Sequence, residues 1–477
     1  MLSIRDALAD PALFGSHFQG ESWARWRVFL SGLFGLPLSD TDVDTWKAHT
    51  GREDVPGRPF REAYVVVGRR GGKSRTMSAV AVFLACFQDY ADVLSPGEQG
   101  EVMLLAPDRR QARVEFKYIE SLIDSSPLLS SMVKSRTKET ITLTNNITIS
   151  VHTSSFRSIR GYTVVAAICD EIAFFHSDDS ANPDTEILNA LRPSMATIPT
   201  GLLLCISTPY SRRGVLWDAY ERYWGEDDPD VLVWQGTTQQ MNPLVPDRVI
   251  ERAYEEDPLA AAAEYGGEFR RDIEALVTPE AVDAAIEPGR YELAPVPGVR
   301  YVGFTDPSGG SADSYTLAIA HQDGAHGILD LVREVRPPFS PEDVTAEFCG
   351  LLKMYGLSSV EGDRYAGEWP RERFAKGGIT YRVSELTKSA IYLSFLPLLN
   401  SGQVDLLDLK RLRAQLVGLE RRTSRAGRDS IDHGPRSHDD VSNAAAGALV
   451  SVQAAPRTVR VGKFWPGSSG GVVLEWE

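Results

Sequence analysis

The stretch "VVVGRRGGKSRT", residues 65–76, decides the fold of the first half of the chain. Its run of valines predicts a buried strand, and the glycine-rich turn that follows ends in Lys73-Ser74. A full P-loop reads G-x4-G-K-[ST]; here Val67 holds the first glycine position, and Gly68 comes one residue later. The match is imperfect, although the turn keeps the chemistry that a phosphate site needs.

The glycines and the lysine explain how such a turn would hold phosphate. Gly71 and Gly72 let backbone N–H groups approach the phosphate oxygens, and the N-terminus of the next helix faces the charge. Lys73 is expected to reach the β- and γ-phosphates of a nucleotide, and Ser74 to bind Mg²⁺. The alternative is a glycine-rich strand–helix turn that carries a lysine by chance.

Strands and helices alternate after this motif, which predicts an α/β domain. Apolar strands separated by helices are typical of a parallel sheet covered on both faces. The segment 141–152, with Asn-Asn at its centre, predicts a β-hairpin. The other expected strands are 64–68, 101–107, 164–171 and 201–209, and the expected helices are about 74–90, 109–124 and 213–224.

Two acids end the third of these strands. Asp170 is expected to hold Mg²⁺ through water, and Glu171 to polarise the attacking water. "CISTP" (205–209) ends the next strand, where Ser207 and Thr208 are candidates for sensing the γ-phosphate. The alternative for the two acids is an acidic loop that merely follows a strand.

Four arginines near these motifs are candidates for contact with phosphate. Arg69 and Arg70 lie inside the turn, where a guanidinium would touch the phosphates of its own subunit. Arg157 and Arg160 precede the acidic strand, and either would serve as an arginine finger offered to a neighbouring subunit. Such a finger raises phosphoryl-transfer rates by roughly 10³–10⁵. The alternative for each arginine is a surface salt bridge.

A second α/β unit opens at "YVGFTDPSGG", residues 301–310. Three antiparallel strands are expected first, with a turn near Asp323–Gly324, followed by alternating helices and strands. This order resembles the ribonuclease-H-like fold with its mixed sheet. The later elements are expected as helices at 341–355, 388–400 and 438–453 and strands within 358–365 and 380–386.

Acidic residues stand at three element ends of this unit. Asp306 and Asp363 end strands, and Asp439-Asp440 open a helix. Carboxylate oxygens suit Mg²⁺ or Mn²⁺ rather than zinc. Two such ions, roughly 3.5–4 Å apart, activate water and stabilise the leaving oxygen of a phosphodiester. We expect Asp306, Asp363 and Asp440 as metal ligands, with Asp439 as the alternative to Asp440. The alternative is that these four aspartates only cap helices or stabilise turns.

Further polar residues of this unit are weaker candidates. Lys388 opens a helix and is a candidate for contact with a DNA phosphate, and His438 and Asp313 for support of the metal ligands. The segment "RRTSRAGRDS" (421–430) has four arginines between two expected helices and would grip a DNA backbone as a loop. The alternative for all of them is a solvated surface.

Composition and charge limit the class of protein. The 477 residues are 43% hydrophobic and carry a net charge of −15, which argues against a protein coated in nucleic acid but allows a basic channel on an acidic body. The four cysteines have no disulfide or zinc spacing, which suits a reducing cytosol. No signal peptide is recognised, and the apolar runs are too short to span a bilayer.

The composition also predicts domain boundaries. We expect a helical lead-in or lid over 1–60, a P-loop ATPase domain over 61–239 and a linker over 240–297. The ribonuclease-H-like nuclease domain is expected over 298–455, and a flexible tail over 456–477.

Over about residues 60–455 the chain resembles the large terminase subunit of tailed bacteriophages. The resemblance is carried by "GRRGGKS", "AAICDE", "CISTP", "FTDPSGG", "EGDRYA" and "SHDDVSNAAAGAL". It implies a RecA-like ATPase domain of the additional-strand, catalytic-glutamate class, followed by a ribonuclease-H-like nuclease. It also implies that Arg69 or Arg70 senses nucleotide within its subunit, that Arg160 acts between subunits, and that adenine contacts lie upstream of Tyr64.

The same resemblance implies cofactors and partners. ATP with Mg²⁺ would drive double-stranded DNA into a procapsid, and two Mg²⁺ or Mn²⁺ ions would serve the cleavage of concatemeric DNA. A ring of five subunits would dock on the portal protein with a small terminase subunit. The expected place is the cytoplasm of a bacterial host and transiently the procapsid portal, without a membrane and not in the mature virion.

Two other functions are weighed against this one. A helicase-like or DNA-repair ATPase fused to a nuclease shares both sites, but the long helicase motif sets after "STP" are missing. A structural protein with decayed sites is disfavoured because the expected catalytic lysine and carboxylates are intact.

Overall fold

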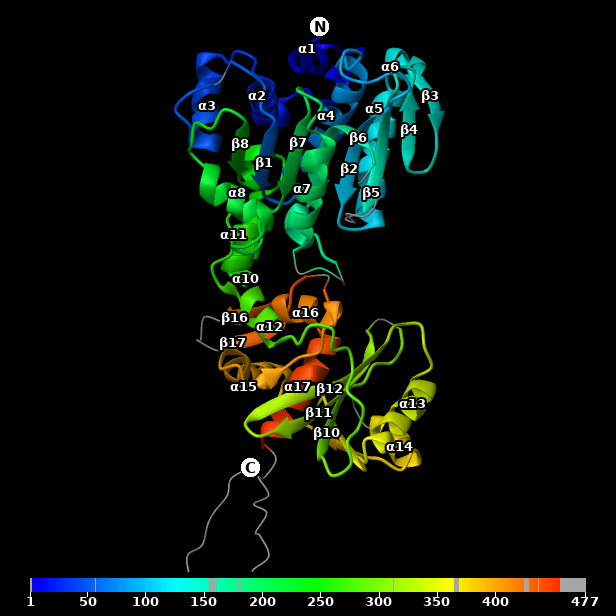
Figure 1. Cartoon of the computed structure of the whole chain (residues 1–477). Coiled ribbons are helices and arrows are strands. Elements are labelled where there is room, and N and C mark those ends of the chain that lie inside the picture. Colours follow the sequence, from blue (N-terminus) through cyan, green and yellow to red (C-terminus); the bar gives the residue numbers. More distant parts are fainter. Residues whose placement is uncertain are drawn as a thin grey trace, which may run out of the picture. The chain divides into compact units, whose positions relative to one another are not determined.

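The computed structural model describes residues 2–55, 57–153, 159, 161–177, 180, 182–311, 313–363, 369–423, 429–435 and 437–454. The chain forms two compact units, Met1–Glu274 and Ala275–Glu477 (Figure 1). The division falls inside β9 (Ile273–Ala275), within the segment 240–297 that the sequence predicts as a linker. The expected lead-in, 1–60, belongs to the first unit.

The first unit is built on one eight-stranded sheet. Six neighbouring strands are parallel, and the hairpin strands β3 and β4 extend the sheet in antiparallel fashion. In spatial order the strands are β3 (Val133–Arg136), β4 (Thr140–Leu143), β5 (Ile147–Thr153), β2 (Gly100–Ala106), β6 (Thr163–Asp170), β7 (Leu202–Ser207), β1 (Glu62–Val67) and β8 (Val231–Gly236). The predicted parallel sheet and the hairpin over 141–152 are confirmed.

Strand order places the two predicted halves of the phosphate site close together. β7 lies between β1, which precedes the glycine-rich turn, and β6, which ends at Asp170. This is the additional strand of the predicted ATPase class. Because all three strands are parallel, their carboxyl ends meet at one edge of the sheet.

Helices cover both faces of this sheet. Alternate residues of each strand point to opposite faces, so Val65 packs with α2, α4 and α5, while Val66 packs with α7 and α8. The helices are α1 (Ile4–Ala9), α2 (Ala24–Leu33), α3 (Asp40–Thr50), α4 (Lys73–Phe87), α5 (Arg109–Asp124), α6 (Pro127–Ser131), α7 (Pro183–Ser194), α8 (Val215–Tyr223), α9 (Thr238–Met241), α10 (Asp247–Glu256) and α11 (Pro258–Glu264).

The second unit contains a six-stranded mixed sheet. β10 (Tyr301–Asp306), β11 (Tyr315–Asp323) and β12 (His326–Val335) are antiparallel, and β13 (Ser359–Gly362) and β14 (Thr380–Val383) run parallel to β10. The order is β14-β13-β10-β11-β12-β15, with β15 at Val404–Asp405. This is the predicted ribonuclease-H-like arrangement, with β10 at its centre.

Helices and a hairpin complete the second unit. α17 lies against β10, β11 and β12, while Phe348 of α13 packs into the core cluster of the sheet. The helices are α12 (Pro279–Ala285), α13 (Pro341–Met354), α14 (Trp369–Lys376), α15 (Lys388–Asn400), α16 (Lys410–Val417) and α17 (Asp440–Ala454). In the described part of the chain, no helix combines the length and apolar character needed to cross a membrane.

The basic segment 421–430 corrects one expectation. Instead of a loop between two helices, its described residues lie in the antiparallel strands β16 (Leu419–Thr423) and β17 (Asp429–His433). Arg421 is paired with Asp429, and Arg422 with Glu420. These two guanidinium groups are therefore held by acids of the same hairpin.

Candidate functional site

The glycine-rich turn joins β1 to α4 in a conformation that needs glycine. Gly72 has a φ of +95°, and a Cβ there would lie 3.0 Å from Nε1 of Trp26. The indole of Trp26 donates to the carbonyl oxygen of Gly71 at 2.7 Å, so α2 holds the turn in place. Arg70 takes a φ of +63°, a left-handed position that a glycine more often fills.

Lys73 lies at the centre of this site. Its side chain is 6% exposed, and its ammonium donates to the carbonyl of Val67 at 2.9 Å and to Oγ1 of Thr208 at 2.7 Å. Oε1 of Glu171 lies 3.4 Å away. The lysine is thus held at the meeting point of β1, β6 and β7.

Glu171 is oriented by the end of β7. Its Oε2 accepts hydrogen bonds from Oγ of Ser207 at 3.0 Å and from the backbone N–H of Thr208 at 3.1 Å. The backbone of Glu171 has a φ of +51°. Thr208 therefore contacts both Lys73 and Glu171, which places the predicted base, lysine and sensor in one network.

Asp170 lies deeper in the same site. Its Oδ2 accepts from Nε2 of Gln111 at 2.9 Å and from Oγ of Ser74 at 3.4 Å. The Asp170 carboxylate is fully buried and also lies within hydrogen-bonding reach of the carboxyl group of Glu115. A buried carboxylate joined to the serine of a glycine-rich turn suits the water shell of a Mg²⁺ ion.

Glu115 of α5 is a site residue that the sequence analysis missed. It is fully buried, and burial, followed by the charge of Asp170, raises the pKa of Glu115 well above its ordinary value. A protonated Glu115 can donate to Asp170, which removes the repulsion between two buried carboxylates. The sequence does contain a signal for this residue. Glu115 comes three residues after the buried Ala112 and four before Ile119, which places an acid on the apolar face of the helix.

The arginines of the turn have partners in the first unit. Arg69 forms an ion pair with Glu264 of α11, and its carbonyl accepts from Oγ1 of Thr238 at 2.7 Å. The carbonyl of Arg70 accepts from Nδ2 of Asn242 at 2.8 Å. Residues of α9 and α11, together with Asn242, therefore also hold the turn. The predicted finger residues Arg157 and Arg160 lie outside the described residues.

A second site lies in the second unit, around Asn443 of α17. Its Nδ2 donates to Oδ2 of Asp306 at 2.8 Å and lies 3.3 Å from Oδ2 of Asp363. One amide thus bridges the two carboxylates that end β10 and follow β13. Sequence analysis missed Asn443, although its position three residues after Asp440 puts both on one helix face.

Asp440 approaches this pair from the start of α17. Loss of hydration raises the pKa of Asp306 well above its ordinary value, and the charges of Asp440, Asp363 and Asp439 raise it further. Oδ2 of Asp440 accepts from the backbone N–H of Ser314 at 3.2 Å. The mutual repulsion of these carboxylates is relieved by a cation, and an all-oxygen donor set suits Mg²⁺ or Mn²⁺.

The neighbours of this cluster have other contacts. Asp439 accepts from the hydroxyl of Tyr392 at 3.1 Å and pairs with Lys388 at 3.1 Å. Lys388 is therefore paired with two protein carboxylates. His438 lies 3.7 Å from Asp313.

Asp440→Asn is expected to stabilise the cation-free protein more at neutral than at acidic pH. Burial, and then the charge of Asp439, raise the pKa of Asp440 to about 6 from an ordinary 3.8. Between these values the folded state binds more protons than the unfolded state, so the free energy of unfolding falls as pH rises. Urea unfolding with a chelator, at about pH 4 and about pH 7.5, measures the difference. An equal effect of the substitution on the free energy of unfolding at both pH values would contradict the raised pKa of Asp440.

Comparisons with known proteins find one family model and several solved structures that resemble the chain. The family model "Uncharacterized protein MJ0330, N-terminal P-loop domain" matches residues 45–266. A comparison with curated proteins finds no match. The solved structures that resemble the chain include the HK97 bacteriophage large terminase, 14% identical, covering 82% of this chain and 91% of that chain with a TM-score of 0.36.

Two further solved structures are similar to the chain. The large terminase of the thermophilic bacteriophage D6E is 12% identical and covers 91% of this chain and 99% of that chain, with a TM-score of 0.40. The large terminase nuclease of the thermophilic phage G20c is 18% identical and covers 36% of this chain and 95% of that chain, with a TM-score of 0.32. The first unit is a P-loop domain, and the chain is similar to phage large terminases.

Proposed function

We propose that the chain is a DNA-packaging motor protein of the large terminase kind. It would hydrolyse ATP in the first unit and cleave double-stranded DNA in the second. The observation that supports this most is the presence in one chain of two separate sites. One joins Lys73, Glu171 and Thr208, and the other joins Asp306 and Asp363 through Asn443.

The first site can bind and orient a nucleoside triphosphate. Gly71, Gly72 and the start of α4 would supply backbone N–H groups to the phosphates, and Lys73 would move its ammonium from Thr208 to them. Ser74 and Asp170 would hold the shell of a Mg²⁺ ion, which neutralises phosphate charge when bound. Glu171 would accept a proton from the attacking water.

Thr208 would link the chemistry to movement. It donates its backbone N–H to Glu171 and accepts from Lys73 through its hydroxyl. Transfer of Lys73 to a phosphate therefore frees the Thr208 hydroxyl while the bond to Glu171 remains. The end of β7 would in this way respond to the presence of the γ-phosphate.

The second site would hold divalent ions between carboxylates of three elements. Asp306, Asp363 and Asp440 are the proposed ligands, and the bound ions would supply charge neutralisation at a phosphodiester. Asn443 would orient two of the ligands through its amide. ATP hydrolysis would drive DNA into a procapsid, and cleavage would release the packaged length.

The same proposal implies partners and a cellular location for the protein. Double-stranded DNA is the substrate of both activities, and the portal protein, a small terminase subunit and four further copies of the chain are the proposed partners. Arg160 is proposed to serve the site of a neighbouring copy. The protein would act in the cytoplasm of a bacterial host and transiently at the procapsid portal.

Purified protein and plasmid DNA test the proposal. We expect linear and nicked products in the presence of Mn²⁺, no products with a chelator, and ATP hydrolysis that DNA stimulates. Intact plasmid at all Mn²⁺ concentrations, from protein that is folded by circular dichroism, would contradict the nuclease half of the proposal.

A further inference from the structure

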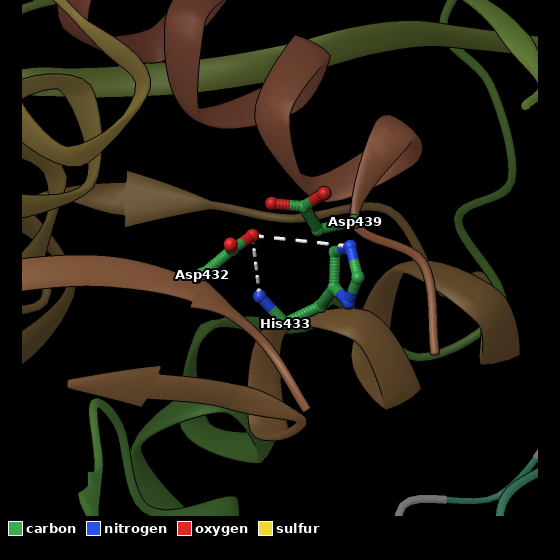
Figure 2. A group of neighbouring side chains, drawn as sticks. All are labelled: Asp432, His433 and Asp439. Carbon is green, nitrogen blue, oxygen red and sulfur yellow. Dashed lines mark hydrogen bonds and ion pairs between the residues drawn. The ribbon is translucent and has the colours of Figure 1, made fainter. Parts of the chain in front are cut away.

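A separate group of metal-type ligands lies where β17 ends and α17 begins. Asp432, His433 and Asp439 each offer one ligand atom, and these atoms all lie within 4.8 Å of one another. Figure 2 shows the three side chains close together, with dashed lines joining the carboxylate of Asp432 to His433. Among the described residues this is the group that meets that distance, whereas Asp306, Asp363 and Asp440 do not form one.

The imidazole of His433 is oriented as in a metal ligand. Its Nδ1 lies 2.9 Å from the carbonyl oxygen of Gly434, which can only accept a hydrogen bond. The proton of the neutral ring therefore sits on Nδ1, and Nε2 carries the lone pair. Nε2 lies 3.8 Å from Oδ1 of Asp432. Histidines that bind metal commonly fix their second nitrogen in this way.

The carboxylates of Asp432 and Asp439 already have a cationic partner. The ammonium of Lys388 lies 2.7 Å from Oδ1 of Asp432 and 3.1 Å from Oδ2 of Asp439. Asp439 is 5% exposed, while Asp432 and His433 keep 42% and 37% of their side-chain surface, so an ion can enter from solvent. One lysine faces two acids here, and the charge of Asp439 also acts on Asp306 and Asp440. The cluster therefore has a surplus of negative charge.

We propose that Asp432, His433 and Asp439 bind a divalent transition-metal ion that takes the place of the Lys388 ammonium. One imidazole nitrogen and two carboxylate oxygens favour ions such as Zn²⁺ or Co²⁺ over Mg²⁺, which prefers oxygen alone. The site is distinct from the carboxylates bridged by Asn443 and does not depend on DNA cleavage. Because Asp439 precedes Asp440, an ion here would restrain the start of α17.

Calorimetric titration of the full chain with Zn²⁺ tests this site. Excess Mg²⁺ is present throughout, so that oxygen-only sites are filled. We expect one Zn²⁺ equivalent that His433→Ala weakens at least about 100-fold, because a direct ligand is lost. Lys388→Met is expected to tighten binding by about tenfold, because a competing cation is removed. His438→Ala is the matched control, since its ring lies 6.3 Å from that of His433 and pairs with Asp313; it should bind as the wild type does.

Thermal unfolding gives a second measurement on the same proteins. Zn²⁺ should raise the melting temperature of the wild type, Lys388→Met and His438→Ala, but not that of His433→Ala, because an ion that binds only the folded state stabilises it. Three results would overturn the proposal: equal Zn²⁺ affinity in the wild type and His433→Ala, an equal loss in His438→Ala, or weaker binding in Lys388→Met. None of these results bears on plasmid cleavage in Mn²⁺.

Discussion

Asp306→Asn is expected to lower metal-dependent DNA cleavage at least about 10³-fold and to leave ATP hydrolysis unchanged. The carboxylate ends β10 and meets Asp363 through Asn443. Asparagine keeps the volume and an oxygen that can accept from Asn443, but it removes the charge that would hold the ions. Bound ions contribute several kcal/mol to charge stabilisation, and about 1.4 kcal/mol corresponds to a factor of ten in rate.

The second unit offers a matched control for this substitution. Asp330 of β12 is 1% exposed and pairs with His321 at 2.7 Å, away from the carboxylate cluster. Asp330→Asn therefore changes a buried aspartate of the same sheet and should leave cleavage unchanged. If the Asp306→Asn protein cleaved plasmid DNA in Mn²⁺ at the wild-type rate, Asp306 would not be a ligand of the catalytic ions. Loss of both activities in a folded Asp306→Asn protein would contradict the separation of the two sites.

The sequence predicted the central sheet of each unit because its signals are local. The valines before Gly68 and the acids after "VVAAIC" mark strand ends, and parallel strands place such ends at one edge. β8 was not predicted: Val231–Gly236 is as long as β1 and β7, but it directly follows a polar turn. The segment 240–297 reads as a linker from its composition, yet Asn242 and Glu264 within it contact the glycine-rich turn. Those contacts join residues far apart in sequence.

The functional sites show the same limit of prediction from sequence. Sequence motifs named Lys73, Glu171 and Asp306, which carry chemistry that few other residue types can supply. They did not name Glu115, Gln111 or Asn443, whose roles depend on what faces them across the fold. The sequence also does not reveal the backbone conformation of the glycine-rich turn. Arg70 adopts the left-handed conformation itself, and Asn242 holds its carbonyl.

Glu171→Gln is expected to lower ATP hydrolysis by about 10³-fold while nucleotide binding and plasmid cleavage persist. Loss of a general base costs typically 10²–10⁴-fold in rate. Glutamine keeps an oxygen that can accept from Ser207 and from the N–H of Thr208, so the network at the end of β7 survives without the base. Phosphate release measures the rate, and binding of a fluorescent ATP analogue measures affinity.

Glu101→Gln is the matched control in the first unit. Glu101 is 6% exposed in β2, where Oε1 lies 4.0 Å from His152, so the substitution alters a buried glutamate of the same sheet without touching the network of Lys73 and Thr208. It should hydrolyse ATP at the wild-type rate. A Glu171→Gln protein that keeps more than about a tenth of that rate would exclude Glu171 as the base, because a general base contributes more than this. If Glu171→Gln lost cleavage and Asp306→Asn lost hydrolysis, the two sites would be one coupled system rather than two independent ones.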